Sequence, residues 1–370
     1  MKKNTQTFKL AELFCGPGGL SLGATQAQVI DRFGKLIQVK PVWSNDIDES
    51  TCKTYARNIH HNDSSSKVVC APVETIDFNN VPDFDVLAFG FPCNDFSVVG
   101  EQKGFNGKYG PLYTYGLKAI NIRNPQWFMA ENVSGIQSAN DGNSFIKILE
   151  DLENAGKGYT ITAHLYKFEE YGVPQTRHRV VIVGIRKDLG LKFKVPKPIT
   201  VNKYLTAKEA IESPPISPSA PNHETTRQGK LVIERLKYIP PGENAWYEGI
   251  PEYLRLNVKG ARMSQIYRRL HPDKPSYTIT GSGGGGTHVY HWNENRALTN
   301  RERARIQTFP DDFVFEGSKE SVRKQIGMAV PPKGAKVIVE AVLKTFAKIP
   351  YEWVLPKLTN GNGNGQKSLF

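Results

Sequence analysis

A glycine-rich turn near the N-terminus constrains the fold of this chain most. Residues 8–14 are predicted to form a strand, and they lead into the turn Cys15-Gly16-Pro17-Gly18-Gly19 and a helix-like run from Leu20. Glycines in such a turn let backbone N–H groups at a helix N-terminus approach a ligand closely. The arrangement is typical of the start of a nucleotide-binding βαβ unit, although similar turns also occur where no ligand binds.

Strands and helices alternate over the first half of the chain. We expect a helix over 144–155 and strands at 37–44, 68–73, 84–89, 127–131, 159–165 and 179–185. This alternation indicates an α/β fold with a mostly parallel, doubly wound sheet. The pattern stops near residue 192.

Asp46 lies at the tip of the second predicted strand, where an acidic side chain can bind ribose hydroxyls. It could instead cap the predicted helix 49–58, and the two roles are compatible. The interval from Gly19 to Asp46 is longer than the roughly twenty residues usual in such units. The first helix or its loop must therefore carry extra length.

Cys93 follows a buried-looking strand, 85–89, through Gly90, Phe91 and Pro92. Open α/β sheets place their chemistry at such strand ends. The alternative is a small apolar residue that fills the end of the strand. The cysteines 15, 52, 70 and 93 show neither a C-x-x-C pair nor metal-ligand spacing, so we expect no metal and a reduced, intracellular setting.

The charge of the chain points to a polyanionic partner. The net charge is +12 and the pI is about 9.3, as in many proteins that bind nucleic acid. A proline- and serine-rich stretch over 195–221 suggests a domain boundary, and basic and aromatic residues interleave between 199 and 300. Such a surface suits contacts with phosphates, although a solvated basic face of a small β-rich domain is the alternative.

The N-terminus is polar, and no run of 18 apolar residues occurs, so we expect a cytoplasmic protein that does not enter membranes. Towards the C-terminus we expect a helix over 298–309 capped by Thr299 and a helix over 333–346. The tail that contains the Asn-Gly repeat 360–365 is expected to be disordered.

Six blocks occur in order along the chain: 12–19 (ELFCGPGG), 90–93 (GFPC), 131–133 (ENV), 171–179 (YGVPQTRHR), 298–310 (LTNRERARIQTFP) and 325–332 (QIGMAVPP). With these blocks the chain resembles the DNA (cytosine-5)-methyltransferases of bacterial restriction-modification systems over about residues 13–342. The resemblance implies a Rossmann-like S-adenosylmethionine-dependent methyltransferase domain and a smaller, β-rich target-recognition domain.

The implied domain boundaries are 1–195 for the catalytic and cofactor-binding domain and 196–300 for the target-recognition domain. Residues 301–326 would form a hinge and support region, 327–350 a helix that completes the catalytic domain, and 351–370 a disordered tail.

By resemblance, the Cys93 thiolate adds to C6 of cytosine, which makes C5 nucleophilic. Glu131 would hold the N3/N4 edge and help to protonate N3, and Arg179 would bond O2, with Arg177 in support. The target base must be flipped out of the duplex, and a loop over about 93–112 would close on it.

The implied cofactor is S-adenosyl-L-methionine, with S-adenosyl-L-homocysteine as product and no metal. The glycine turn would hold the methionine end, Asp46 the ribose, and Ile47 the adenine. The full predicted set is Phe14, Gly16, Pro17, Gly18, Gly19, Leu20, Asp46, Ile47, Val73, Pro92, Leu112, Met328 and Ala329. Four positions depart from the family pattern: Asn94 replaces the usual glutamine, Met328 an asparagine, Pro72 an acidic residue and Ile47 an aromatic. None is a predicted catalytic residue, so we expect activity with weaker cofactor affinity.

Double-stranded DNA is the implied partner, with a cognate restriction endonuclease as a partner in function, and we expect a monomer at the nucleoid. The predicted DNA-binding residues are Ser97, Arg227, Lys230, Arg262, Arg268, Arg269, Thr278, Gly284 and Arg303. Two alternatives remain open: an RNA (tRNA) cytosine-5 methyltransferase, and a catalytically inactive DNA-binding regulator. A nicotinamide-dependent dehydrogenase would explain only the glycine turn.

Overall fold

The computed structural model describes residues 5–61, 63, 66–91, 112–257, 263–281 and 285–358, with the backbone alone at 139–141 and 285. Cys93, Pro92, Ser97, Arg262 and Gly284 lie outside these ranges. The chain divides into two compact units. The first comprises 1–167, 178–199 and 332–370, and the second comprises 168–177 and 200–331.

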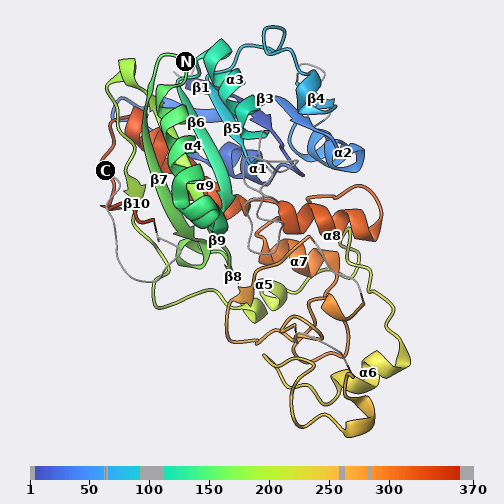
Figure 1. Ribbon diagram of the computed structural model, residues 1–370. Coiled ribbons are helices and arrows are strands. Elements are labelled where there is room, and N and C mark those ends of the chain that lie inside the picture. Colours follow the sequence, from blue (N-terminus) through green and yellow to red (C-terminus); the bar gives the residue numbers. More distant parts are fainter. Residues whose placement is uncertain are drawn as a thin grey trace. The chain divides into compact units, whose positions relative to one another are not determined.

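The first unit is built on one large sheet (Figure 1). Its strands are β1 (Thr5–Leu13), β2 (Gln28–Ile30), β3 (Leu36–Asp46), β4 (Lys67–Cys70), β5 (Val86–Phe89), β6 (Trp127–Val133), β7 (Tyr159–Lys167) and β9 (His178–Arg186). The order is β2-β3-β1-β5-β6-β9-β7, and β4 also pairs with β3. The pairs among β4, β3, β1, β5 and β6 are parallel, whereas β2, β9 and β7 pair antiparallel. The predicted mostly parallel α/β sheet is confirmed.

Both faces of this sheet are buried. Every residue of β5 is buried, as expected for a central strand covered by helices on both sides. Along β1, Ala11 and Leu13 belong to the core cluster that includes residues of α3 and α4, while Phe8 packs against Phe346 of α9 with ring centroids 4.9 Å apart. The helices are α1 (Gly19–Gln26), α2 (Glu49–Asn58), α3 (Tyr113–Arg123), α4 (Asn143–Asn154) and α9 (Pro332–Phe346).

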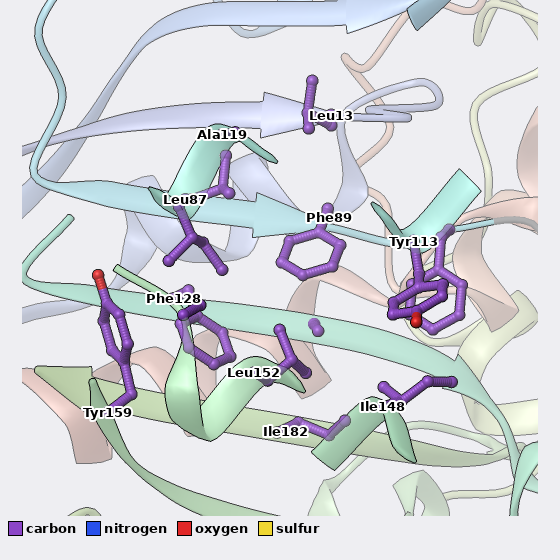
Figure 2. Close-up of a cluster of buried hydrophobic side chains, with 14 of the residues drawn as sticks. Leu13, Leu87, Phe89, Tyr113, Ala119, Phe128, Ile148, Leu152, Tyr159 and Ile182 are labelled. Carbon is purple, nitrogen blue, oxygen red and sulfur yellow. The ribbon is translucent and has the colours of Figure 1, made fainter. Parts of the chain in front are cut away.

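Figure 2 shows the core cluster between the sheet and two of these helices. Leu87, Phe89 and Phe128 come from β5 and β6, and they meet Ile148 and Leu152 of α4. The Phe89 and Phe128 rings lie 6.3 Å apart, a distance at which aromatic pairs add to the energy of burial. This packing fixes the strands whose ends carry the predicted site.

The strand β2 explains the long interval between Gly19 and Asp46. It pairs antiparallel with the start of β3, so that Val29 lies opposite Ile37. The connecting turn is held by Asp31, whose Oδ1 accepts hydrogen bonds from the backbone N–H groups of Phe33 (2.8 Å) and Lys35 (2.9 Å). The extra length is thus a hairpin at the edge of the sheet, and a strand of three residues is too short to show alternation in the sequence.

The C-terminal region departs from the expected tail. Strand β12 (Trp353–Val354) pairs antiparallel with β10 (Val195–Pro196), and Leu165 N–H donates to Lys357 O at 2.8 Å. The expectation of disorder is therefore wrong for 351–358, while 359–370 lie outside the described residues. The Asn-Gly repeat on which the prediction rested begins only at 360.

The second unit contains α5 (Ala207–Glu212), α6 (Lys230–Leu236), α7 (Asn300–Ile306) and α8 (Lys319–Met328). Among its described residues, the strands are β8 (Gln175–Thr176) and β11 (Ser276–Tyr277), which pair parallel. The expectation of a β-rich domain is therefore corrected for this part of the chain. Backbone carbonyls that a sheet would pair are bonded instead by side chains such as Arg269, which donates to the carbonyl oxygens of Leu236, His291 and Trp292 at 2.6–2.9 Å.

None of the described helices combines the length and apolar character that crossing a membrane requires.

We predict that Gly23→Ala lowers the stability of the protein. A Cβ at Gly23 of α1 would lie 2.3 Å from the carbonyl oxygen of Pro332, at the start of α9. Alanine normally favours a helix over glycine by roughly 1 kcal/mol, but the two helices must separate to admit it, so we expect a net loss of roughly 1–3 kcal/mol. Chemical denaturation measures this. Gly229→Ala, where an added Cβ meets nothing within 4 Å, is the control; equal stability of both variants would contradict the prediction.

Candidate active site

The C-terminal ends of three parallel strands meet at one edge of the sheet. Strand β1 pairs with β5, and β5 with β6, in a register that aligns Leu13, Phe89 and Ala130. The residues that follow are Phe14, Gly90 and Glu131, each from one of the sequence blocks. The chain continues from Gly90 to Phe91, whose carbonyl oxygen accepts a hydrogen bond from Asn132 Nδ2 at 3.2 Å. Cys93 follows two residues later, outside the described range.

Glu131 and Arg179 form an ion pair at this edge. Arg179 Nε lies 3.1 Å from Glu131 Oε1, and each side chain is only 14% exposed. Strands β6 and β9 run antiparallel with Val133 opposite Arg179, which brings the two side chains together. Arg179 Nη1 also donates to the carbonyl oxygen of His178 at 2.8 Å. The second carboxylate oxygen, Oε2, would lie 3.3 Å from a Cβ built on Gly90, so it faces the chain that leads to Cys93.

This pair offers complementary hydrogen-bonding groups in a partly dry setting. The carboxylate accepts hydrogen bonds or, when protonated, donates one, and the guanidinium donates only. A ring with an amine, a ring nitrogen and a carbonyl along one edge matches such a pair. The structure therefore brings Glu131 and Arg179 together, as the predicted roles require.

Arg177 lies in the second unit and has a different environment. Its side chain is buried, and its Nη atoms donate to the carbonyl oxygens of Ile279 (3.1 Å), Gly327 (3.1 Å) and Ala329 (3.0 Å). These hydrogen bonds fix the Thr278–Ile279 segment and the end of α8. The environment favours a structural role, in which Arg177 positions other motif residues.

The glycine turn has the backbone conformation that the sequence suggested. Gly16 and Gly18 have positive φ angles of 54° and 95°, and Phe14 also has a positive φ of 53°, which is uncommon outside glycine. A Cβ on Gly18 would lie 2.6 Å from Ile59 Cγ1, whereas one on Gly16 would meet nothing within 4 Å. The turn is packed at Gly18 and open at Gly16, where a ligand can approach.

Asp46 holds the turn from the neighbouring strand. Its Oδ2 accepts from Gly16 N–H at 2.9 Å and its Oδ1 from Asp48 N–H at 3.0 Å. The cap of α2 is Asp48, whose Oδ1 accepts from Thr51 N–H at 2.8 Å, so the capping alternative for Asp46 does not apply. Burial raises the pKa of Asp46, opposed by its backbone hydrogen bonds.

The other predicted cofactor residues vary in exposure. Ile47 is 69% exposed beside Asp46, Val73 is buried at the start of the 3-10 turn Val73–Thr75, and Leu112 immediately precedes α3. Met328 and Ala329 end α8 in the second unit, where Met328 is 64% exposed. In the first unit, three features suit an adenosyl ligand. The carboxylate of Asp46 suits the ribose, the exposed side chain of Ile47 suits the base, and the open turn at Gly16 suits the charged end.

A buried network that the sequence analysis missed supports the turn. Ser21 Oγ donates to the carboxylate of Glu12 and lies 2.6 Å from Tyr55 OH, which is itself 3.1 Å from Glu12 Oε2. Burial raises the pKa of Glu12 to about 8, opposed by the hydrogen bonds from Ser21 and Tyr55. The network links β1, α1 and α2 around the turn. The signal in the sequence is an acidic residue between the apolar Ala11 and Leu13 at the end of a strand.

The predicted DNA-binding residues of the second unit divide by burial. Arg227 and Lys230 are exposed, Arg268 is half-buried with its guanidinium 4.4 Å from the centre of the Tyr277 ring, and Thr278 Oγ1 donates to Thr176 O at 2.6 Å. Arg269 and Arg303 are buried. The two Nη atoms of Arg269 bond backbone carbonyls and Asn295, so we assign Arg269 a structural role instead of a DNA contact.

We predict that Glu12 makes stability depend on pH. Its folded pKa of about 8 exceeds the usual 4.5, so its contribution is complete below about pH 4.5 and is lost as the pH rises towards 8. Within this window the loss approaches about 1.4 kcal/mol per pH unit at most. Glu12→Gln, which mimics the protonated form, should lose less stability between pH 6.5 and 8 in urea denaturation. Parallel pH profiles for the two proteins would contradict the prediction.

Comparison with known proteins identifies the family. The profile of the C-5 cytosine-specific DNA methylases matches residues 8–344. The chain is 60% identical over 350 residues to the type II methyltransferase M.BbvI of Brevibacillus brevis, covering 93% of each chain. It is 41% identical over 348 residues to M.NgoFVII of Neisseria gonorrhoeae, covering 92% of this chain and 87% of the relative.

The fold is also known from solved structures. A protein described as a DNA modification methyltransferase encoded within an Escherichia coli prophage superposes with a TM-score of 0.69 at 23% sequence identity, covering 92% of this chain and 99% of that one. This likeness supports the Rossmann-like methyltransferase fold. The chain belongs to the C-5 cytosine-specific DNA methylase family, and it is a DNA (cytosine-5-)-methyltransferase of the restriction-modification type, from a family that depends on S-adenosylmethionine.

Proposed function

We propose that the protein methylates C5 of a flipped-out cytosine within a short double-stranded DNA sequence, through a covalent bond between Cys93 and C6. The observation that carries the proposal is the Glu131–Arg179 ion pair, which lies beside Gly90 at the strand edge from which the chain leads to Cys93. The family membership supplies the substrate class.

The chemistry requires a nucleophile because C5 of cytosine is too weak to attack a methyl group unaided. In the proposed sequence the Cys93 thiolate forms a bond to C6, and Glu131 delivers a proton to N3 as charge builds on the ring. Arg179 donates to O2 and holds the ring against the thiol. C5 then accepts the methyl group, which S-adenosylmethionine supplies when bound. Loss of the C5 proton to solvent breaks the S–C6 bond and releases the Cys93 thiolate, and N3 returns its proton to Glu131, which restores the neutral aromatic ring.

Base flipping follows from geometry. C6 is stacked inside a duplex, and a thiolate must approach it from above the ring plane, so the nucleotide has to leave the stack. The segment 93–112 contains four glycines, at 100, 104, 107 and 110, and we propose that it closes over the base. Ser97 in this segment would contact a phosphate.

The cofactor would lie over the glycine turn. We propose that the turn at Gly16–Gly19, with Leu20 behind it, receives the methionine end, that Asp46 bonds the ribose hydroxyls, and that the exposed Ile47 covers the adenine. The open space over Gly16 and the carboxylate of Asp46 support this placement. Phe14, Val73, Leu112 and the Met328–Ala329 pair remain predicted members of the site.

DNA recognition would use the second unit. Arg227, Lys230 and Arg268 retain exposed or half-exposed cationic groups that suit phosphates or guanine edges. We propose a cytoplasmic monomer that protects its host genome beside a cognate endonuclease. The description of its relatives as type II methyltransferases supports the link to a restriction-modification system.

We predict that Cys93→Ala abolishes methylation of plasmid DNA. The wild type, incubated with labelled S-adenosylmethionine, should place label on cytosine C5 at one recurring sequence, found by single-base mapping. Glu131→Gln should retain slow activity, lowered roughly 10²–10⁴-fold, because proton transfer is lost while the nucleophile remains.

Glu153→Gln is the matched control, since Glu153 of α4 is partly exposed and pairs with Lys187, away from the predicted site. Label on tRNA but not on DNA would favour the RNA alternative. Absence of label on either, with retained DNA binding, would favour an inactive DNA-binding regulator.

A further inference from the structure

A small recess with a cationic floor lies in the second unit between α7 and α8. It is lined by Arg303 and Asn300 of α7, Lys319 and Arg323 of α8, His288 and Leu298, and by Glu224 and Thr226 at its rim. Arg303 and His288 are buried, Arg323 is partly buried, and Lys319 is exposed. The free space amounts to about 10 Å³, enough for roughly one atom of the size of a water oxygen.

Arg303 differs from the other buried arginines of this unit. Arg301 donates to the carbonyl oxygens of Pro221, Pro310 and Phe313, and Arg177 and Arg269 are likewise bonded to carbonyl oxygens. Arg303, only 2% exposed, makes one long contact of 3.5 Å, from Nη2 to His288 Nδ1. Its Nε, like that of Arg269, has no partner among the described residues, so the difference lies in the terminal nitrogens, which bond no carbonyl oxygen among the described residues. Burying a guanidinium without an acceptor is costly, so the native state is expected to supply one.

Nearby carboxylates do not fill this role. Glu302, the nearest acid on α7, is held by Arg296 through two hydrogen bonds of 2.8 Å. Glu320 lies 3.9 Å from Arg323 with its side chain 87% exposed, and Glu224 is an exposed residue at the rim. The lining of the recess therefore contains three cationic side chains, Arg303, Lys319 and Arg323, and one carboxylate, that of Glu224.

The protonation states keep the recess positive at neutral pH. Burial lowers the pKa of Arg303 to about 10, so its side chain remains charged. Burial, with the nearby charges of Arg303 and Arg323, lowers the pKa of His288 to about 4, so the imidazole is neutral and adds no charge. Arg323 Nε is also buried without a partner among the described residues.

We propose that this recess is a phosphate-binding site, in which one anionic oxygen of a phosphate enters between Arg303 and Arg323 while Lys319 contacts the group from the rim. The size of the recess admits one oxygen and leaves the rest of the phosphate outside. A phosphodiester of the DNA backbone is the source that fits best, and this assignment rests on the proposed function. Inorganic phosphate presents the same oxygen and is the simpler probe.

The first arm measures thermal unfolding in sodium phosphate and in sodium chloride at equal ionic strength. Phosphate should raise the Tm of the wild type by binding the folded state. Arg303→Met should be at least as stable as the wild type in chloride, because an unpaired buried charge is replaced by an apolar chain of similar length. Its Tm should not respond to phosphate. Arg323→Gln, at the less buried position, should show the same loss of response if Arg303→Met fails to fold.

The second arm measures binding of duplex DNA against salt concentration. The logarithm of the DNA-binding constant falls as the logarithm of the salt concentration rises, by roughly 0.9 per neutralised phosphate. Each variant should therefore make this dependence less steep by about one. Lys324→Ala, an exposed lysine on α8 outside the recess, is the matched control. It should retain the phosphate response and should not show the loss in slope expected of both recess variants.

The outcomes separate the two proposals. A phosphate response that depends on Arg303 and Arg323 supports the site even if no DNA is methylated, which would defeat the proposed function alone. The same response with an unchanged DNA slope would assign the site to free phosphate and overturn the DNA assignment. No phosphate response in the wild type, together with unchanged slopes in both variants, would overturn the site.

Discussion

The parallel pairing of β1, β5 and β6 is the constraint on which the site depends. Parallel strands end at the same edge of a sheet, so the residues after Leu13, Phe89 and Ala130 are brought together from three distant parts of the chain. The antiparallel strand β9 adds Arg179 beside the end of β6. The sheet register therefore makes neighbours of the glycine turn, the segment that leads to Cys93 and the ion pair Glu131–Arg179.

Buried polar groups add directional contacts that hold this edge of the sheet. The carboxylate of Asp46 accepts hydrogen bonds from the backbone of Gly16 and Asp48. The carboxyl group of Glu12 accepts hydrogen bonds from the hydroxyl groups of Ser21 and Tyr55 near the turn. A buried carboxylate is stable only when hydrogen bonds or protonation offset its desolvation, which makes these positions specific in geometry. The second unit uses the same principle with the opposite charge, since buried guanidinium groups bond carbonyl oxygens that no strand pairs.

Much of this could be predicted from the sequence. The strand, turn and helix at residues 8–26 follow from local pattern, and Glu131 and Arg179 follow from their motif blocks. The hairpin β2, the partners of Glu12 and the burial of Arg177, Arg269 and Arg303 could not be foreseen. From the sequence, an arginine is expected at the surface. Its burial depends on carbonyl oxygens that only tertiary folding brings close to it. The β-rich second domain was an inference from the family, and in the described residues its strands are replaced by side-chain bonds.

The covalent route through Cys93 is most directly tested with a duplex that carries 5-fluorocytosine at the methylated position. After methyl transfer, C5 would carry fluorine in place of the proton that must leave, so the S–C6 bond cannot break. We expect a protein–DNA complex that survives denaturation with the wild type, forms more slowly with Glu131→Gln, and is absent with Cys93→Ala. Methylation of ordinary cytosine by the wild type with no trapped complex, or a trapped complex with Cys93→Ala, would contradict it.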